Sequence, residues 1–165
     1  MPSKPLKDLS QLDFNAPLFT LEDIQKINPQ RYEFSQLTAV IYVDEGAHLA
    51  VGYKDITEEE FWVAGHMPGF PLMPGVIQCE CAAQLAGFYA RKFDVLDGRY
   101  VGFGGMKDVH FRRPITPRCR LDIVCQITRM RARRIAHFQF QGFVDAVLMF
   151  DGTMMGASIS SADDT

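Results

Sequence analysis

The feature that most constrains this chain is an apolar stretch from Pro74 to Phe93 that contains a single glutamate, Glu80. Proline is tolerated in the first turn of a helix, and the residues that follow are apolar on nearly every side of a helical wheel. A helix that is apolar all round is buried all round. In a chain of 165 residues, this pattern predicts one long helix enclosed by the rest of the structure.

The segments on both sides of this helix have the patterns of a short helix and several strands. Residues 15–27 predict an opening helix in which Thr20 is the N-cap and Asp23 completes an acidic capping box, and Pro29 ends it. Strands are expected near residues 33–43, 47–56, 99–111, 120–131, 134–144 and 147–159. Together these elements predict an α+β fold in which a strongly bent antiparallel sheet wraps one central helix.

Two local features refine this fold. The glycines at 102, 104 and 105 predict bulges or close backbone approach within their strand. An open sheet also leaves an edge strand that needs a partner, which favours a dimer with a continuous sheet.

The chain length and its 47% apolar content fit a single domain, residues 1–165. The first residues, 1–18, and the last, 160–165, lack apolar periodicity, so we expect loose termini there.

The cysteines at 79, 81, 119 and 125 lack the spacing of a zinc site and are interpreted as free thiols. The chain begins with polar residues, and its longest apolar run is broken by prolines, Gly75 and Glu80. We therefore expect no secretory leader, no membrane insertion and a cytoplasmic location.

The net charge of −3 is unevenly distributed, because residues 1–90 carry −7 and residues 91–165 carry +4. Eight arginines lie between positions 112 and 134. They are either a solvated strand face or a docking surface for an acidic partner. No nucleic-acid motif is present, so nucleic acid is not the expected partner.

Glu80 has three explanations in this apolar setting. It is the seventh residue of the predicted helix, too far from the N-terminus for the helix dipole to stabilise its charge. It could pair with an arginine, or it could be a catalytic acid whose proton is retained because the apolar surroundings disfavour the charged form.

His66 lies in the loop GHMPGFPLMPG, which prolines and glycines make rigid. This loop leads into the helix start, where the free N–H groups of Gly75 and Val76 can stabilise a developing negative oxygen. A neutral imidazole, a protonated carboxyl and such donors satisfy the needs of β-elimination next to a carbonyl. This chemistry requires no metal, nucleotide or other cofactor.

The spaced residues His66, Pro68, Gly69, Pro71, Met73–Val76, Glu80 and Ala83–Gln84 closely resemble the signature of bacterial 3-hydroxyacyl-[acyl-carrier-protein] dehydratases of the FabZ type. The segments IQKINPQRYEF and FGGMKDVHFRRPITP extend the similarity to roughly residues 20–160. The resemblance implies a hot-dog fold and dehydration of 3-hydroxyacyl thioesters to trans-2-enoyl thioesters in fatty acid biosynthesis.

The resemblance also implies roles for particular residues. His66 would take the α-proton, Glu80 would protonate the departing hydroxyl, and the two would come from different subunits of a homodimer, three of which often form a hexamer. Gly75 would donate its amide to the thioester carbonyl, and Gln84 could orient the Glu80 carboxyl. The acyl chain would lie in an apolar tunnel, for which the expected lining residues are Leu85, Phe88, Phe103 and Met106. Acyl carrier protein would be the acidic partner.

Three positions depart from the pattern of this family. Gln30 stands where a histidine is usual, Met67 where phenylalanine is common, and Arg118 where glycine is common. These departures favour a paralogue with a different acyl-chain preference or one that acts in a specialised pathway. The rival interpretations are a hot-dog enoyl-CoA hydratase, an acyl thioesterase and a non-catalytic subunit that binds acyl carrier protein.

Overall fold

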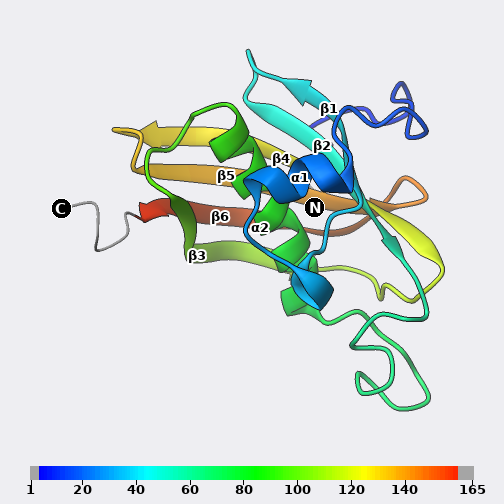
Figure 1. The fold of residues 1–165 in the computed structure, drawn as a ribbon. Coiled ribbons are helices and arrows are strands. Elements are labelled where there is room, and N and C mark those ends of the chain that lie inside the picture. Colours follow the sequence, from blue (N-terminus) through cyan, green and yellow to red (C-terminus); the bar gives the residue numbers. More distant parts are fainter. Residues whose placement is uncertain (1–3, 160–165) are drawn as a thin grey trace.

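The computed structural model describes residues 4–159, in which two α-helices accompany one six-stranded antiparallel sheet (Figure 1). The strands lie in the order β1-β2-β4-β5-β6-β3. The helices are α1 (Leu21–Ile27) and α2 (Gly75–Lys92), and the strands are β1 (Ala39–Asp44), β2 (Leu49–Ile56), β3 (Tyr100–Phe111), β4 (Cys119–Arg131), β5 (Ile135–Val144) and β6 (Val147–Ile159). This is the predicted α+β hot-dog architecture.

Helix α2 lies across one face of the sheet and contacts β2, β3, β4, β5 and β6, and α1 packs beside it (Figure 1). The main core fills the space between helix and sheet, with fully buried side chains such as Leu85, Phe88 and Phe138. The N-terminus of α1 has the predicted capping box between Thr20 and Asp23. The first strand starts later than expected, because residues Tyr32–Phe34 form a 3₁₀ turn and β1 begins at Ala39.

The prediction that α2 is buried on every side is wrong for the single chain. Val76 is 71% exposed, and Glu80, Ala83 and Gly87 are only partly buried. These residues recur at helical spacing, so they form one stripe that the sheet of this chain does not cover. An apolar helix face left open in this way is a surface suited to a ligand or to another protein.

The opposite face of the sheet carries a second, smaller core. Because side chains alternate along a strand, Leu49, Val51 and Val124 point away from α2. Leu6, Leu9 and Leu12 of the N-terminal segment pack on this cluster. Residues 4–18, expected to be loose, therefore make defined contacts with the sheet, whereas residues 1–3 and 160–165 lie outside the described part of the chain.

Strand β3 forms an edge of the sheet and shows the bulges that its glycines predict. Its register with β6 shifts between Phe103 and Gly105. A β-carbon at Gly102 would lie 2.4 Å from the Ile159 side chain, so a larger residue there would force this side chain to shift. Three large apolar side chains of this edge strand are about half exposed: Phe103, Met106 and Phe111.

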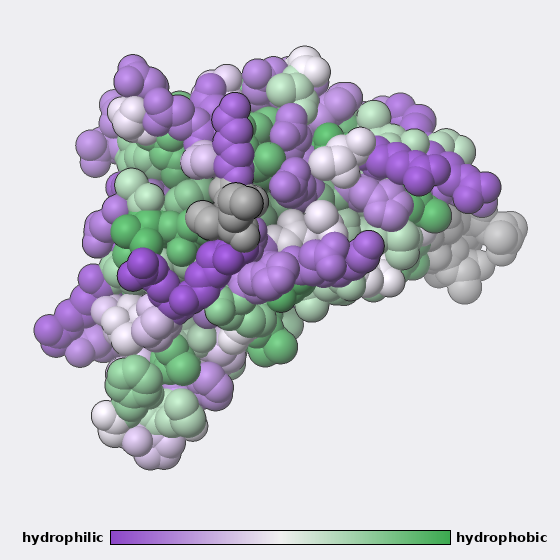
Figure 2. Space-filling view, turned by 180° about the vertical axis from the view of Figure 1, so that it is seen from behind, coloured by the Kyte–Doolittle hydropathy of each residue, from purple (hydrophilic) through white to green (hydrophobic). Residues whose placement is uncertain are grey.

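A long segment between β2 and α2, residues 57–74, extends beyond the sheet (Figure 1). Figure 2 shows that its projecting end has a largely apolar surface. Phe61, Met67 and Phe70 are each about half exposed there. The open stripe of α2, the edge of β3 and this segment thus each expose apolar side chains, and exposed apolar surfaces of this kind can mark interaction sites.

Candidate active site

His66 is held in its loop by backbone atoms. Its N–H donates to the carbonyl of Trp62 (2.8 Å), and its carbonyl accepts from the N–H of Leu72 (2.8 Å). Its ring Nδ1 lies 2.6 Å from the carbonyl oxygen of Leu72. A carbonyl can only accept, so Nδ1 carries the hydrogen, and a neutral ring then has a free lone pair on Nε2. This is the tautomer that a general base needs.

The loop behind His66 is anchored at Met73, one residue before the proline that caps α2. The buried Met73 donates its N–H to the carbonyl of Ile115 (2.8 Å), and its own carbonyl accepts from Nε2 of Gln78 (3.1 Å). Gln78 is 3% exposed. The rigidity that the prolines and glycines predict is therefore reinforced by buried hydrogen bonds from two other segments.

The imidazole opens into a shallow pocket at the start of α2. Its lining residues are His66, Leu72, Met73, Gly75, Gln78 and 111–114. Gly75 is the first residue of α2, and the N–H groups of a first helical turn have no acceptor within the helix. A β-carbon on Gly75 would lie 2.7–3.0 Å from ring atoms of Phe111, so any larger residue here would force that ring or the backbone to shift. Val76, also predicted to bind substrate, is strongly exposed beside it and is not among the lining residues.

Glu80 lies on the open stripe of α2, two residues beyond Gln78, and is partly buried. Its Oε1 accepts a hydrogen bond from Nε2 of Gln84, one helical turn later (2.8 Å). Burial raises the pKa of the Glu80 carboxyl, and the hydrogen bond from Gln84 opposes that shift. The net direction is upward, which favours a proton on this carboxyl at higher pH than in water.

Gln84 is itself fixed by the segment between α1 and β1. Its Nε2 also donates to the carbonyl of Phe34 (2.6 Å), and its Oε1 accepts from the N–H of Gln36 (2.8 Å). The backbone carbonyl of Gln84 accepts from Nδ2 of Asn28 (3.0 Å). The expected contact between Gln84 and Glu80 is thus present, and a buried network holds Gln84 in place.

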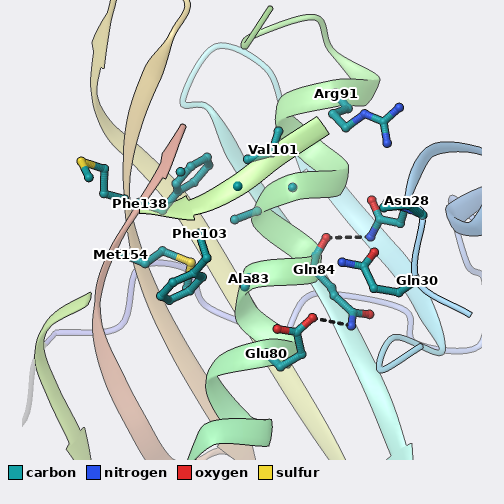
Figure 3. Close-up of a pocket in the computed structure, with 16 residues that line it drawn as sticks. Asn28, Gln30, Glu80, Ala83, Gln84, Arg91, Val101, Phe103, Phe138 and Met154 are labelled. Atoms are coloured by element: carbon teal, nitrogen blue, oxygen red, sulfur yellow. Dashed lines mark hydrogen bonds between the residues drawn. The ribbon is translucent and has the colours of Figure 1, made fainter. Parts of the chain in front are cut away.

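Glu80 lines a pocket that runs along α2 toward Arg91 (Figure 3). One wall is polar and comes from α2 and the segment after α1, with Asn28, Gln30, Gln84 and Arg91. The facing wall is mostly apolar and comes from strands β3, β5 and β6, with Val101, Phe103, Phe138 and Met154. A carboxyl at one end of a pocket with an apolar wall suits a ligand that has one reactive polar end and a hydrocarbon tail.

The predicted lining residues are divided among three places. Phe103 and Gln84 line the Glu80 pocket. Leu85 and Phe88 are fully buried in the main core and are not among its lining residues, because they point to the sheet side of α2. Met106 lines a different surface pocket, with Lys107 and His137. Sequence reasoning did not assign Asn28, Gln30 or Arg91 to the site, although Gln30 had been marked by its departure from the family pattern.

The two ionisable residues line separate pockets in the single chain. The residues around His66 and those around Glu80 have no member in common. One chain alone therefore holds the imidazole in one pocket and the carboxyl in another.

Four of the eight clustered arginines are paired within the chain: Arg112 with Asp151, Arg118 with Glu58, Arg120 with Asp122, and Arg133 with Asp94 and Asp97. Arg113 lies at the edge of the His66 pocket.

The four cysteines are free thiols, as predicted. Within residues 4–159, no helix is long and apolar enough to cross a membrane.

Comparisons with known proteins bear on the family and the fold of this chain. A family model described as a FabA-like domain matches residues 28–153. The chain is 34% identical to the 3-hydroxyacyl-[acyl-carrier-protein] dehydratase FabZ of Herpetosiphon aurantiacus, over 86% of this chain and 99% of that protein. It is also 34% identical to the FabZ of Clostridium novyi, over 79% of this chain and 94% of that protein.

Solved structures support the fold alone. A chain of the dehydratase heterocomplex ApeI:P from Xenorhabdus doucetiae superposes with a TM-score of 0.70 at 14% identity, covering 84% of this chain and 91% of that one. Cj0977 from Campylobacter jejuni, described as a sigma28-regulated virulence protein, gives a TM-score of 0.64 at 17% identity, covering 90% and 98%. With the family model and the two relatives, the chain belongs to the FabA-like family, among the 3-hydroxyacyl-[acyl-carrier-protein] dehydratases of the FabZ type.

Proposed function

We propose that this protein dehydrates 3-hydroxyacyl thioesters on acyl carrier protein to trans-2-enoyl thioesters in fatty acid biosynthesis. The observation that carries the proposal is the Glu80 carboxyl, whose pKa is raised by burial and which Gln84 orients at the end of a pocket with an apolar wall. Raising the pKa lets this carboxyl keep its proton to higher pH than in water, and a protonated carboxyl can donate to a leaving hydroxyl.

The elimination uses both pockets. Nε2 of His66 takes the proton from the carbon next to the thioester carbonyl, and the N–H of Gly75 stabilises the negative charge that develops on the carbonyl oxygen. The bond between carbon 3 and its hydroxyl breaks as Glu80 donates its proton, so water leaves. A proton lost from His66 and one regained by Glu80 reset the enzyme. Each acid or base contributes roughly 10²–10⁴-fold, and the amide donor about 10²–10³-fold.

The site requires two chains in this proposal. Each chain exposes apolar side chains on the projecting 57–74 segment, on the α2 stripe and on the β3 edge. A two-fold dimer that pairs these surfaces would bury them and would bring His66 of one subunit to Glu80 of the other. Three such dimers would form the hexamer that the family resemblance implies.

Acyl carrier protein is the proposed partner, because an acidic protein bearing a phosphopantetheine arm suits a basic surface beside the site. Arg113, at the edge of the His66 pocket, is the arginine best placed to meet it. We expect the enzyme to act in the cytoplasm, where its free thiols would stay reduced.

The test is turnover of a 3-hydroxyacyl substrate on acyl carrier protein, followed by mass spectrometry of the trans-2-enoyl product. Product formation that depends on His66 and Glu80 is the expected result. A higher kcat/KM with the matched coenzyme A thioester would instead favour the enoyl-CoA hydratase, and release of free acid would favour the thioesterase. Binding of the acyl carrier without any reaction would assign the chain to the non-catalytic class.

A further inference from the structure

Gln30, in the segment after α1, points toward the Glu80 face of α2 and lines the pocket there (Figure 3). It occupies the position where the sequence departs from the usual histidine of the family. Its Oε1 is buried and has no hydrogen-bond partner within the described residues. Leaving a buried acceptor unpaired is unfavourable, so a group of this kind in a pocket calls for an explanation.

The other polar residues on the same wall are engaged. Gln84 uses its amide on Glu80, Phe34 and Gln36. Asn28 donates its Nδ2 to the carbonyl of Gln84, and Arg91 donates to the carbonyl of Ile27. Among the polar residues of this wall, Gln30 is therefore the one with a buried side-chain atom that lacks a hydrogen-bond partner within residues 4–159.

The proposed reaction supplies a ligand group of matching chemistry. The 3-hydroxyl of the substrate accepts the proton of Glu80, and its own hydrogen needs an acceptor. The facing wall of Val101, Phe103 and Phe138 offers hydrocarbon and no side-chain acceptor. A hydroxyl both donates and accepts, so it can pair with a primary amide in either orientation.

We propose that Gln30 binds the 3-hydroxyl of the substrate beside Glu80 and holds the water that leaves from it. This inference rests on the function proposed above. The side chain gains and loses no proton: the proton of the α-carbon goes to His66, the proton of Glu80 goes to the hydroxyl oxygen, and Gln30 contributes only hydrogen bonds. Its role is to fix the leaving group against the acid.

The test uses two unreactive pantetheine thioesters of equal chain length. One is a 2,2-difluoro-3-hydroxyacyl thioester, which has no α-proton and cannot be eliminated, and the other lacks the 3-hydroxyl. Their inhibition constants are measured for the wild-type enzyme and for Gln30→Leu. We expect the wild type to prefer the hydroxylated probe by about threefold to tenfold, the range of one net hydrogen bond, and Gln30→Leu to bind both equally.

Gln139→Leu is the matched control, because Gln139 lies on β5 and is not among the residues that line the Glu80 pocket. It should keep the wild-type preference. Gln30→Met, which preserves side-chain length and removes the amide, should lose the preference as Gln30→Leu does and serves if the leucine variant fails to fold. If the Gln30 variants keep the wild-type preference, or if they bind both probes more weakly by the same factor, the inference is overturned and Gln30 has only a packing role. Failure of the proposed function would show separately, as no turnover of the ordinary substrate by the wild type.

Discussion

The pockets around His66 and around Glu80 are built in different ways. His66 is held by backbone atoms of its own loop, within ten residues of sequence, and its pocket is shallow. Glu80 is held by a side chain, Gln84, which in turn depends on residues 34 and 36. The proposed base is thus preorganised by local chain geometry and the proposed acid by a buried network of distant segments. Substitutions near the two residues should therefore have different effects.

The largest expected effects come from removing the two reacting groups. His66→Ala removes the base and Glu80→Gln removes the proton donor while keeping the shape, so each should lower kcat by roughly 10²–10⁴-fold. The measurement is enoyl formation on acyl carrier protein, with circular dichroism to verify folding. A folded Glu80→Gln enzyme with near-normal kcat would contradict the acid role.

A smaller loss is expected from crowding the helix start. The added carbon in Gly75→Ala meets the Phe111 ring at 2.7–3.0 Å, so the ring or the backbone must shift. Displacing the amide donor by a fraction of an ångström should lower kcat/KM by about tenfold to a hundredfold. Gly105→Ala is the control, because its added carbon has no neighbour within 4 Å and Gly105 lines neither the His66 pocket nor the Glu80 pocket, so kcat/KM should stay unchanged. Equal behaviour of the two variants would argue against a role for the Gly75 amide.

Substitutions of the two buried glutamines, Gln84 and Gln78, should affect the pH dependence of kcat/KM differently. In Gln84→Leu the hydrogen bond that lowers the pKa of Glu80 is lost, so this pKa rises further. Activity that needs protonated Glu80 is lost as pH rises through its pKa, so the alkaline limb of the kcat/KM profile should move to higher pH. Gln78→Leu unpairs the Met73 carbonyl on the His66 side and should lower kcat without moving that limb. An alkaline limb that moves in Gln78→Leu, or one that does not move in Gln84→Leu, would contradict the expectation that only Gln84 acts on the pKa of Glu80.

The smallest expected effect is a gain of stability in Glu80→Gln. Folding raises the pKa of the Glu80 carboxyl. The contribution of this carboxyl to stability is therefore fully present at pH values below its pKa in the unfolded chain, and it is lost as the pH rises through its pKa in the folded protein. The variant should therefore match the wild type below about pH 4 and exceed it at neutral pH by roughly 0.5 kcal/mol, a figure kept small for solvent screening. Urea unfolding at both pH values measures the difference, and a less stable variant at neutral pH would contradict the raised pKa.

The two pockets also differ in what the sequence could reveal. The His66 loop is local, so its prolines, its glycines and the N-terminus of α2 marked the site directly. Glu80 was visible because a carboxylate interrupts an apolar helix. The fold followed from the same apolar helix and from strand alternation, although the 3₁₀ turn at residues 32–34 was missed because Tyr32 adopts a left-handed backbone conformation that propensities do not anticipate.

The walls of the Glu80 pocket could not be predicted in this way. They come from residues near 28–30, 101–103, 138 and 154–156, which only the folded sheet brings together. Periodicity identified Leu85 and Phe88 as apolar but not the side of α2 on which they lie, and both are in the core. In the sequence, Gln30 stood out only as a departure from the family pattern. The structure shows that this residue lines the Glu80 pocket.

The central claim is that base and acid act together only across two chains, and mixing the inactive His66→Ala and Glu80→Gln enzymes tests it most directly. After subunit exchange, verified by mass spectrometry of a heavy-isotope-labelled partner, each mixed dimer should hold one intact site, and turnover should return to about a quarter of the wild-type rate. Verified exchange without any recovery of turnover would contradict the shared site.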